Sequence, residues 1–238
     1  ALLFYKPFLH WFLRRAKKII VTSPNIIESS PHLQKVKEKI TVIPLGINPK
    51  KYLEVTTPNP MNKKYALFVG RFIYYKGVLE LIEALKKSDV HLVMIGDGIL
   101  KKEMMLIGNH LLKSNQLTIL PFQEDTKLKA FFKHCEFLIL PSTHPSEAFG
   151  IVQLEAMIYS NPVISTNLPT GVPYVNKHNT SGLIVEPKNI NELATAMNNL
   201  WNDPLLTKEL GRNAFQRCKS LCLQSTMIDK TRDLIKKL

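Results

Sequence analysis

Two glutamates stand eight positions apart in the segment SEAFGIVQLEAM, residues 146–157. If GIVQLEAMIYS forms a helix, its buried face carries Ile151, Leu154 and Ile158. Glu155 then projects elsewhere, and Glu147 lies in the loop before the helix. Eight helical residues span about 12 Å, whereas the two carboxylates of a glycosidase lie roughly 5 to 10 Å apart. The spacing therefore disfavours a glycosidase pair and favours an extended ligand that reaches from one acid to the other.

The middle of such a ligand would lie at the start of the helix. The backbone amides of Phe149, Gly150 and Ile151 could bind an anionic group there, because helix N-termini attract anions. Carboxylates accept hydrogen bonds from vicinal hydroxyls, so Glu155 could hold a ribose and Glu147 a second sugar. The plainer alternative is that Glu147 only complements the helix dipole and that Glu155 is an exposed helix residue.

A second candidate site follows an apolar run in FVGRFIYYKG, residues 68–77. Gly70 would allow a tight turn, Arg71 offers a forked hydrogen-bond donor and Lys76 adds a mobile positive charge. Two cations at the end of one strand would suit a diphosphate. Surface Arg and Lys beside a turn are also commonplace, so this segment alone is a weak signal. It lacks the G-x(4)-G-K-[ST] pattern of a Walker phosphate-binding loop.

The elements that would position these residues are six short apolar runs from residue 65 onward. They are YALFVG, HLVMIG, LTILP, FLILPS, PVIST and GLIVEP, and each is too continuous for a half-exposed strand. Helical patterns lie between them at about residues 77–87, 99–113, 126–134 and 150–159. The alternation predicts an α/β fold with a Rossmann-like, doubly wound parallel sheet. Ligands bind such sheets at the carboxyl ends of the strands, so both candidate segments are expected at one crevice.

The two ends of the chain differ from this central region. AKKIIVTSP and KITVIPLGIN predict two more short strands, and the polar stretch KYLEVTTPNPMNKK that follows them is typical of a linker. After residue 186 the pattern is helical, with Asp203 as an expected N-cap and Pro204 at the first helical position. We therefore expect four parts: residues 1–50 in one domain, a linker at 51–64, a second domain at 65–220, and a terminal helix at 221–238 that packs back toward the first domain.

Composition is that of a globular protein with a strong positive charge: 45% of the residues are hydrophobic and the net charge is +13. This charge favours anionic partners such as nucleotides, acidic lipid surfaces or nucleic acid. The cations are spread over several segments without a nucleic-acid reader motif, so nucleic acid is not expected as a partner.

Three cysteines without a C-x-x-C pair argue against a disulfide framework or a zinc site, and for a reducing, cytoplasmic setting.

The chain opens without an initiator Met in an apolar segment, which indicates a fragment of a longer protein. This opening run, ALLFYKPFLHWFL, is interrupted by Lys6, Pro7 and His10 and is too short to cross a membrane. It has no small-residue cleavage site, so a signal peptide is not expected.

Taken together, these segments resemble a known family. GRFIYYKG, then SEAFGIVQLEAM about seventy residues later, NPVISTNLPTGVP and SGLIVEP follow the order and spacing of the glycosyl transferases group 1. Specifically, they are similar to the donor-binding half of a family 4 retaining glycosyltransferase with the GT-B fold. The resemblance runs from about residue 40 to the C-terminus. It implies that residues 65–220 form the nucleotide-sugar-binding domain and that residues 1–50 are the C-terminal remnant of the acceptor-side domain.

The resemblance also assigns catalytic roles. Arg71 and Lys76 match the basic pair that binds the diphosphate of a nucleotide sugar. Glu147 matches the first acid of an E-x(7)-E motif, which contacts the donor sugar near the reacting centre. Glu155 matches the second acid, which binds the ribose. The catalytic set implied is thus Glu147, Arg71 and Lys76.

Donor binding is assigned to a further set of residues. By the resemblance, the turn after Glu147 touches the phosphate and sugar through its amides, and LPFQ at residues 120–123 lies where a loop cradles the base. The donor-binding residues expected are Gly70, Phe122, Phe149, Gly150, Ile151 and Glu155.

The reaction implied is transfer of a hexosyl-type sugar from a UDP- or GDP-linked donor to a glycan or lipid-linked acceptor, with retention at the anomeric carbon. The cations and the helix dipole would stabilise the departing diphosphate, so no metal and no other cofactor is expected. The acceptor site, glycine-rich loop and catalytic histidine of the first domain have no counterpart here, and only His144 lies near the crevice. The fragment alone is therefore expected to be inactive. The alternative is a truncated module that binds a nucleotide sugar without transferring it.

The first segment also raises the question of a membrane partner. In a complete enzyme, FLHWFLRRAKK could press aromatic and basic groups against an anionic leaflet that carries a lipid-linked acceptor. The alternative is a helix packed on the missing domain. We expect a cytoplasmic protein, with peripheral contact at the inner face of the cell membrane as a further expectation.

Overall fold

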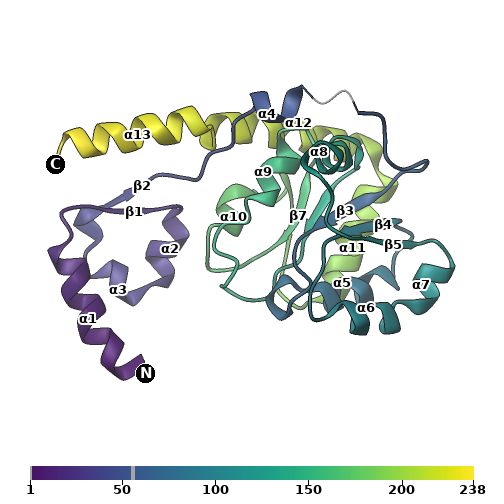
Figure 1. Ribbon diagram of the computed structural model, residues 1–238, viewed down its shortest axis with the longest axis horizontal. Helices are drawn as coiled ribbons and strands as arrows, with labels where there is room; N and C mark the ends of the chain where they lie inside the picture. The colour runs from purple at the N-terminus through teal and green to yellow at the C-terminus, as the bar shows by residue number, and fades with distance from the viewer. Residues whose placement is uncertain (1, 55–56) are drawn as a thin grey trace.

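Six short strands form one parallel sheet in the computed structural model, which describes residues 2–54 and 57–238. Their order is β5-β4-β3-β6-β7-β8 (Figure 1). Their bounds are β3 Ala66–Val69, β4 Leu92–Ile95, β5 Leu117–Leu120, β6 Leu138–Leu140, β7 Val163–Thr166 and β8 Gly182–Val185. These are the six apolar runs that the sequence predicts. The predicted α/β fold with a Rossmann-like parallel sheet is confirmed.

Helices cover both faces of this sheet, which explains why its strands are mostly apolar on both sides. Phe68 and Met94 pack into one hydrophobic cluster, whereas their neighbours Leu67 and Val93 pack into the other. This is the alternation that a strand imposes. The first cluster includes residues from α5 Val78–Leu85, α6 Lys101–Ile107, α7 Asn109–Lys113 and α11 Ile190–Asn202. The second includes residues from α8 Asp125–His134, α9 Val152–Met157, α10 Val172–Val175 and α12 Pro204–Leu221.

The strand order places a reversal between β3 and β6. From β3 the chain moves outward through β4 to β5, then returns to the other side of β3 and moves outward through β6, β7 and β8. The strands β3 and β6 pair directly, with Leu67 opposite Leu138. At such a reversal the following loops turn to opposite sides of the sheet and leave a crevice at the carboxyl ends of the strands.

Two predicted helices have different bounds in the structure. The pattern at residues 99–113 is split into α6 and α7 at Gly108, since glycine weakens a helix by about 1 kcal/mol relative to alanine. The helix expected at 150–159 is the shorter α9, because Gly150 and Ser160 have left-handed φ values of 71° and 63°. The start of α12 is as predicted: the Asp203 side chain accepts hydrogen bonds from two backbone amides, and Pro204 is the first helical residue.

The N-terminal part of the chain forms a separate unit. Its strands β1 Ile19–Val21 and β2 Ile40–Val42 pair in parallel, and helices accompany them. These are α1 Leu2–Arg15, α2 Pro24–Ser29, α3 Pro31–Gln34 and the 3-10 helix η1 Lys37–Lys39. A short helix, α4 Lys50–Leu53, lies inside the segment expected to be a linker. Within the described ranges, no helix combines the length and the apolar character needed to cross a membrane.

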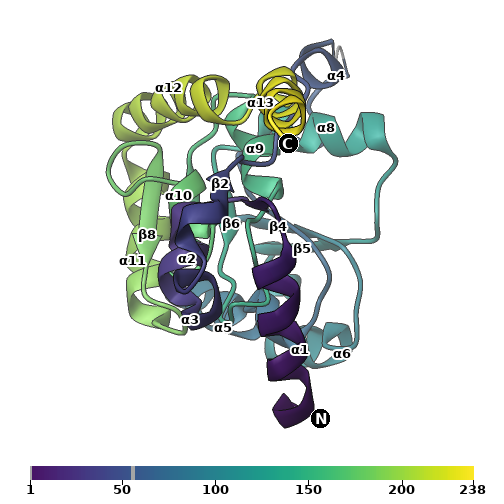
Figure 2. The ribbon, with the colours of Figure 1, turned by 90° about the vertical axis from the view of Figure 1, so that its left-hand side faces the viewer.

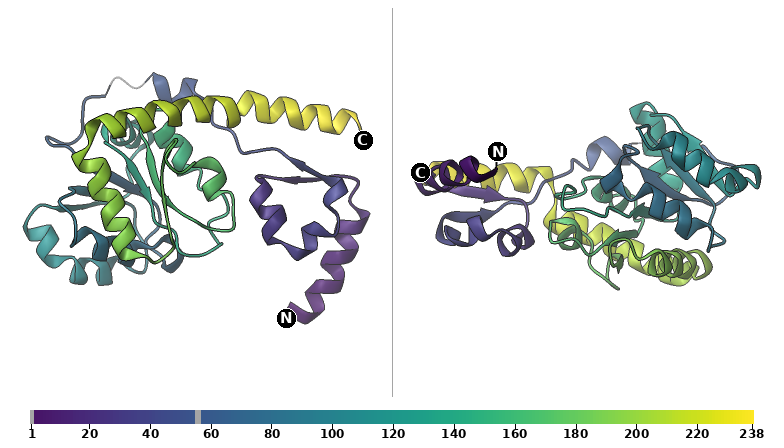
Figure 3. Two further views of the ribbon diagram at one scale, coloured as in Figure 1. Left: turned by 180° about the vertical axis from the view of Figure 1, so that it is seen from behind. Right: turned by 90° about the horizontal axis from the view of Figure 1, so that it is seen from below.

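The C-terminal helix α13 Gln224–Lys236 extends from the sheet domain toward the N-terminal unit (Figure 1). Figure 2, seen from the side of that unit, shows α13 nearly end-on above it, and Figure 3 shows α13 continuing the direction of α12. The Lys17 ammonium donates a hydrogen bond to the carbonyl oxygen of Leu238 at 3.4 Å. The domain limits at 50, 64 and 220 stay predictions.

Candidate functional site

Two loops meet where the sheet reverses direction. The loop after β3 runs through Gly70 to the 3-10 helix η2 Tyr74–Lys76, and the loop after β6 runs from Pro141 to the start of α9. The amide of Thr143 donates a hydrogen bond to the carbonyl of Tyr75 at 2.8 Å, which ties the loops together. The topology therefore brings the basic segment and the acidic segment of the sequence to one place.

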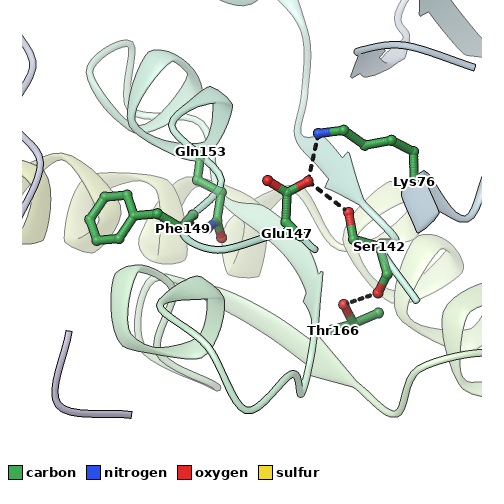
Figure 4. Close-up of polar contacts among 6 residues, drawn as sticks. All are labelled: Lys76, Ser142, Glu147, Phe149, Gln153 and Thr166. Carbon is green, nitrogen blue, oxygen red and sulfur yellow. Dashed lines mark hydrogen bonds and ion pairs between the residues drawn. The ribbon is translucent and has the colours of Figure 1, made fainter. Parts of the chain in front are cut away.

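Lys76 and Glu147 form an ion pair across these loops. The Lys76 Nζ lies 2.5 Å from Glu147 Oε2, and the two side chains are only 13% and 10% exposed (Figure 4). A charge pair removed from water interacts more strongly than one at the surface, but each partner then depends on the other. The pair thus places a cation and a carboxylate side by side at the carboxyl ends of the strands.

Glu147 is held from a second direction by Ser142. The Ser142 hydroxyl donates to Glu147 Oε2 at 3.0 Å, and the Thr166 hydroxyl at the end of β7 donates to the Ser142 carbonyl at 2.5 Å. Ser142 is fully buried and Thr166 nearly so. Sequence reasoning missed both residues. A polar residue at the end of the apolar run FLILPS was the available signal for Ser142.

The glycine that shapes the first loop is Gly77 rather than Gly70. Gly77 has a φ of 66°, and a Cβ at this position would lie 2.0 Å from the Pro141 carbonyl oxygen. Gly70 does not have a left-handed φ, and a Cβ there would make ordinary contacts of 3.4 Å with Phe68 and 3.7 Å with Lys76. The expectation that Gly70 supplies the tight turn was wrong. Gly70 lies at the end of β3, next to the Lys76 side chain.

The turn before α9 presents backbone rather than side chains. Phe149 is 3% exposed, and its ring points away from Glu147 in Figure 4. Gly150 has a φ of 71°, and a Cβ there would lie 2.6 Å from Leu140 and 2.9 Å from the Gln153 amide nitrogen. In the described part of the chain, the amides of residues 149, 150 and 151 have no hydrogen-bond acceptor.

Two side chains near this turn differ from expectation. Ile151 precedes the helix and is 52% exposed, so its placement on the buried face was wrong. Gln153 is buried instead, and it donates to the Phe149 carbonyl at 3.0 Å. Its side-chain oxygen is buried without a partner in the described ranges. The helix starts later than predicted, which rotates residue 151 out of the buried stripe.

Glu155 lies in α9 and contacts the segment between the two domains. The Tyr52 hydroxyl donates to Glu155 Oε1 at 3.0 Å, and the Tyr159 hydroxyl donates to the Tyr52 carbonyl at 2.6 Å. Burial raises the pKa of the Glu155 carboxyl, the Tyr52 hydrogen bond lowers it, and the negative charge of Asp125 raises it. Nothing in the sequence marks Tyr52 as a partner, because the two residues are 103 positions apart.

The remaining predicted residues lie at the same edge of the sheet but are not all in contact. Arg71 is exposed in the loop that carries Lys76, and Phe122 is 63% exposed just beyond β5. The structure joins Lys76 to Glu147, whereas Glu155 has different partners. His144 is exposed, and its Nδ1 accepts a hydrogen bond from the Ser146 amide at 3.1 Å.

Among residues 2–54 and 57–238, no cluster of three His, Cys, Asp or Glu side chains could hold a metal ion.

Comparison with known proteins gives one family match. The model of the family described as "Glycosyl transferases group 1" matches residues 51–217. This range includes both loops of the candidate site and the whole six-stranded sheet.

Two curated proteins are similar to this chain over most of its length. D-rhamnosyltransferase WbpZ of Pseudomonas aeruginosa is 33% identical over 223 residues, covering 91% of this chain and 58% of that protein. O-antigen chain mannosyltransferase C of Escherichia coli is 31% identical over 230 residues, covering 94% of this chain and 62% of that protein. The chain therefore spans about six tenths of the length of these relatives.

Solved structures show the same fold. HepE of Anabaena in complex with UDP has a TM-score of 0.81 at 23% identity, covering 94% of this chain and 65% of that one. A glycosyltransferase from Rickettsia africae also has a TM-score of 0.81 at 23% identity, covering 93% and 63%. The α/β architecture is that of GT-B glycosyltransferases.

Proposed function

Because this chain belongs to the glycosyl transferases group 1 family, we propose that it is the donor-binding half of a family 4 retaining glycosyltransferase. It binds a nucleoside diphosphate sugar and, within the complete enzyme, transfers a hexosyl-type sugar to a glycan or lipid-linked acceptor. Two relatives are a D-rhamnosyltransferase and an O-antigen chain mannosyltransferase. Their names support a sugar of this class and a polysaccharide acceptor.

The observation that carries the proposal is the Lys76–Glu147 pair at the sheet reversal. During transfer, the bond from the anomeric carbon to the diphosphate breaks while an acceptor hydroxyl oxygen bonds to that carbon. Negative charge grows on the leaving oxygen, which takes the proton of the acceptor hydroxyl. Lys76 and the exposed Arg71 lie in one loop where they can share that charge, and donors positioned in advance stabilise a transition state most effectively. Glu147, fixed by Ser142, would contact the sugar that is transferred.

Residues around this pair would bind the phosphates, the ribose and the base of the donor. The amides of residues 149–151, which have no acceptor within the described part of the chain, would bind phosphate oxygens, and Gly70 leaves room beside Lys76 for them. Glu155 would accept hydrogen bonds from the ribose hydroxyls. The exposed ring of Phe122 beyond β5 would stack on a uracil or guanine base.

Calorimetric titration with UDP, UMP, GDP and GMP tests the diphosphate assignment. Lys76→Met and Arg71→Met should each reduce the preference for the diphosphate over the monophosphate by about tenfold, because each removes a charge-assisted contact. Lys102→Met, at an exposed lysine on α6, is the charge-matched control. Thermal unfolding checks Lys76→Met for lost stability, since Glu147 would lose its partner. Unchanged diphosphate preference in both variants would contradict the proposal.

A second candidate function is nucleotide-sugar binding without transfer, because the chain covers 58% and 62% of the two relatives named. A transfer assay on this chain beside the complete enzyme, with UDP- and GDP-sugars, separates the two. In the complete enzyme, Lys76→Ala or Glu155→Ala should lower activity about a hundredfold. Binding without any transfer by the complete enzyme would favour the binding module.

We also propose that α1 brings the cytoplasmic enzyme to an anionic membrane surface where a lipid-linked acceptor lies. Tyr5, Phe8, Trp11 and Phe12 are each more than half exposed, and the Arg15 guanidinium lies 5.4 Å from the Trp11 ring centre. Aromatic and basic groups on one helix suit the interface of an anionic bilayer. Flotation with phosphatidylglycerol vesicles tests this contact, and complete absence from the lipid fraction would remove it. Packing of α1 on another part of the complete enzyme is the competing outcome.

A further inference from the structure

A cavity of about 320 Å³ lies between the start of α5 and the loops that carry Lys76 and Glu147. Its volume is at the lower end of those of small-molecule sites, which run from about 300 Å³ upward. The residues around it that bear on its chemistry are Tyr74, Leu79, Glu80, Thr143, His144 and Lys188. They come from η2, from α5, from the loop after β6 and from the loop after β8. The predicted donor residues lie outside this set.

The cavity shares its wall with the candidate donor site. Tyr74 is two residues before Lys76, and Thr143 directly follows Ser142, whose hydroxyl holds Glu147. The Thr143 amide bond to the Tyr75 carbonyl holds together the two loops that contribute both to the cavity and to the Lys76–Glu147 pair. A ligand in the cavity would therefore lie next to the sugar end of a bound donor.

The most prominent group in the cavity is the ring of Tyr74, which is 65% exposed. Its ring centre lies 5.7 Å from that of Tyr75 and 6.2 Å from that of His144, both in edge-on arrangements. These neighbours restrict the movement of the Tyr74 ring. Little conformational entropy would then be lost when a ligand binds, because a tyrosine side chain has few rotatable bonds. An exposed, braced aromatic ring offers an apolar face to the C–H face of a sugar ring.

The polar groups around the ring include both donors and acceptors. His144 Nδ1 accepts from the Ser146 amide, so the neutral ring carries its proton on Nε2 and donates from there. Among residues 2–54 and 57–238, the carboxylate of Glu80 and the ammonium of Lys188 have no hydrogen-bond or ion-pair partner. Sugar hydroxyls donate and accept at once, so they can use groups of both kinds.

The same set of groups disfavours an anionic ligand. Glu80 would repel a phosphate, and Leu79 adds an apolar surface that a phosphate cannot use. Lys188 has a left-handed φ of 66°, which costs a non-glycine residue about 1 kcal/mol, and its neighbour Asn189 caps α11 through its side chain. These two features fix the backbone of Lys188, whose side chain lines the cavity.

We propose that this cavity binds a pyranose residue of the acceptor glycan, which stacks on Tyr74 and bonds through its hydroxyls to Glu80, His144 and Lys188. The inference rests on the proposed function, because it assigns to this chain a binding site for one part of the acceptor. It places that sugar on the far side of the wall from the diphosphate.

The test is titration of the chain with α-linked mannotriose and with α-linked D-rhamnotriose, each in the presence and in the absence of saturating UDP. Changes in the NMR chemical shifts of the backbone amides report binding. Saccharide binding should persist when UDP is bound and should persist in Lys76→Met. Tyr74→Ala should weaken it about tenfold, the effect of a lost aromatic contact, whereas Tyr74→Phe should retain it. Tyr5→Ala, at an exposed tyrosine of α1, is the matched control.

The outcomes separate this inference from the proposed function. Nucleotide binding together with undetectable saccharide binding, or equal saccharide affinity in Tyr74→Ala, would overturn the saccharide site and leave the donor assignment intact. Displacement of the saccharide by UDP would overturn it as well, because the two ligands would then share one site. Tyr74-dependent saccharide binding without any nucleotide binding would support the cavity and refute the donor assignment.

Discussion

Glu147 Oε2 accepts two hydrogen bonds, one from the Lys76 ammonium at 2.5 Å and one from the Ser142 hydroxyl at 3.0 Å. Bonds to a charged group contribute about 1.5 to 3 kcal/mol, so Ser142→Ala should release the carboxylate from its fixed position. If Glu147 binds the donor sugar, this variant should lose about tenfold in affinity for a nucleotide sugar and little for the free nucleoside diphosphate. Calorimetry with UDP-glucose and GDP-mannose beside UDP and GDP measures the difference.

Thr166→Val is the matched control for this variant. It removes the bond to the Ser142 carbonyl but leaves the Ser142 hydroxyl on Glu147, and its shape is nearly unchanged. It should therefore have the smaller effect on nucleotide-sugar affinity. Equal losses for nucleotide sugar and nucleotide in Ser142→Ala would show that the residue acts only on folding.

The carboxyl of Glu155 predicts a distinct pH dependence. Burial raises its pKa above the usual range for glutamate, and only the ionised form accepts hydrogen bonds from both ribose hydroxyls. An acid with a raised pKa loses its charge earlier as the pH falls. As the pH falls, affinity for UDP or GDP should therefore begin to decline at a higher pH than an ordinary glutamate would cause.

Two variants isolate this effect from titration of the phosphate itself. Glu155→Gln should bind more weakly at neutral pH and should lack the component of the decline that belongs to the carboxyl. Tyr52→Phe removes the hydrogen bond that lowers the Glu155 pKa, so its decline should start at higher pH. Identical pH profiles for the unaltered chain and Glu155→Gln would exclude Glu155 as the titrating group.

Among the elements, the loop between β3 and α5 depends on one glycine. At position 77 an alanine would adopt a left-handed φ of 66° and place its Cβ 2.0 Å from the Pro141 carbonyl oxygen. The conformational cost and the backbone clash together predict that Gly77→Ala lowers the free energy of unfolding by about 3 kcal/mol. Gly70→Ala should change it by less than about 1 kcal/mol, because its Cβ contacts are ordinary. Chemical denaturation measures both, and equal stability of the two variants would contradict the assignment.

Sequence periodicity was sufficient to locate the strands but not to pair the side chains of the site. YALFVG and FLILPS read as buried strands because both faces of a parallel strand are covered, and they are β3 and β6. The strands β3 and β6 are neighbours because of the order of strands in the sheet. The positions of the strands along the sequence do not predict this order. The contact of Lys76 with Glu147 follows from that order, and the contact of Glu155 with Tyr52 follows from the path of the chain outside the sheet. Ile151 was misplaced because helix ends are set by single residues such as Gly150, where periodicity carries little information.

At the scale of the whole molecule, two distant parts of the chain cross at one point. The Ile47 amide donates to the Cys222 carbonyl at 2.7 Å, and the Gln224 amide donates to the Ile47 carbonyl at 2.9 Å. The segment that leaves the β1–β2 unit is thus bonded on both sides to the junction of α12 and α13. This crossing is therefore one structural link between the segment that follows the N-terminal unit and the helices of the sheet domain.

Gly46 makes this crossing possible, since a Cβ at position 46 would lie 2.6 Å from the backbone of Gln224 and 2.7 Å from that of Leu223. Gly46→Ala must separate the two backbones and lose both hydrogen bonds of Ile47. Amide hydrogen exchange at Ile47 and Gln224 should accelerate by about a hundredfold, while the amides of β3 and β4 keep their protection because the sheet has its own core. Gly70→Ala serves as the control for a glycine replaced where the Cβ makes only ordinary contacts. Unchanged exchange at both crossing amides in Gly46→Ala would mean that the two parts of the chain are held together elsewhere, and that the α12–α13 junction is not their link.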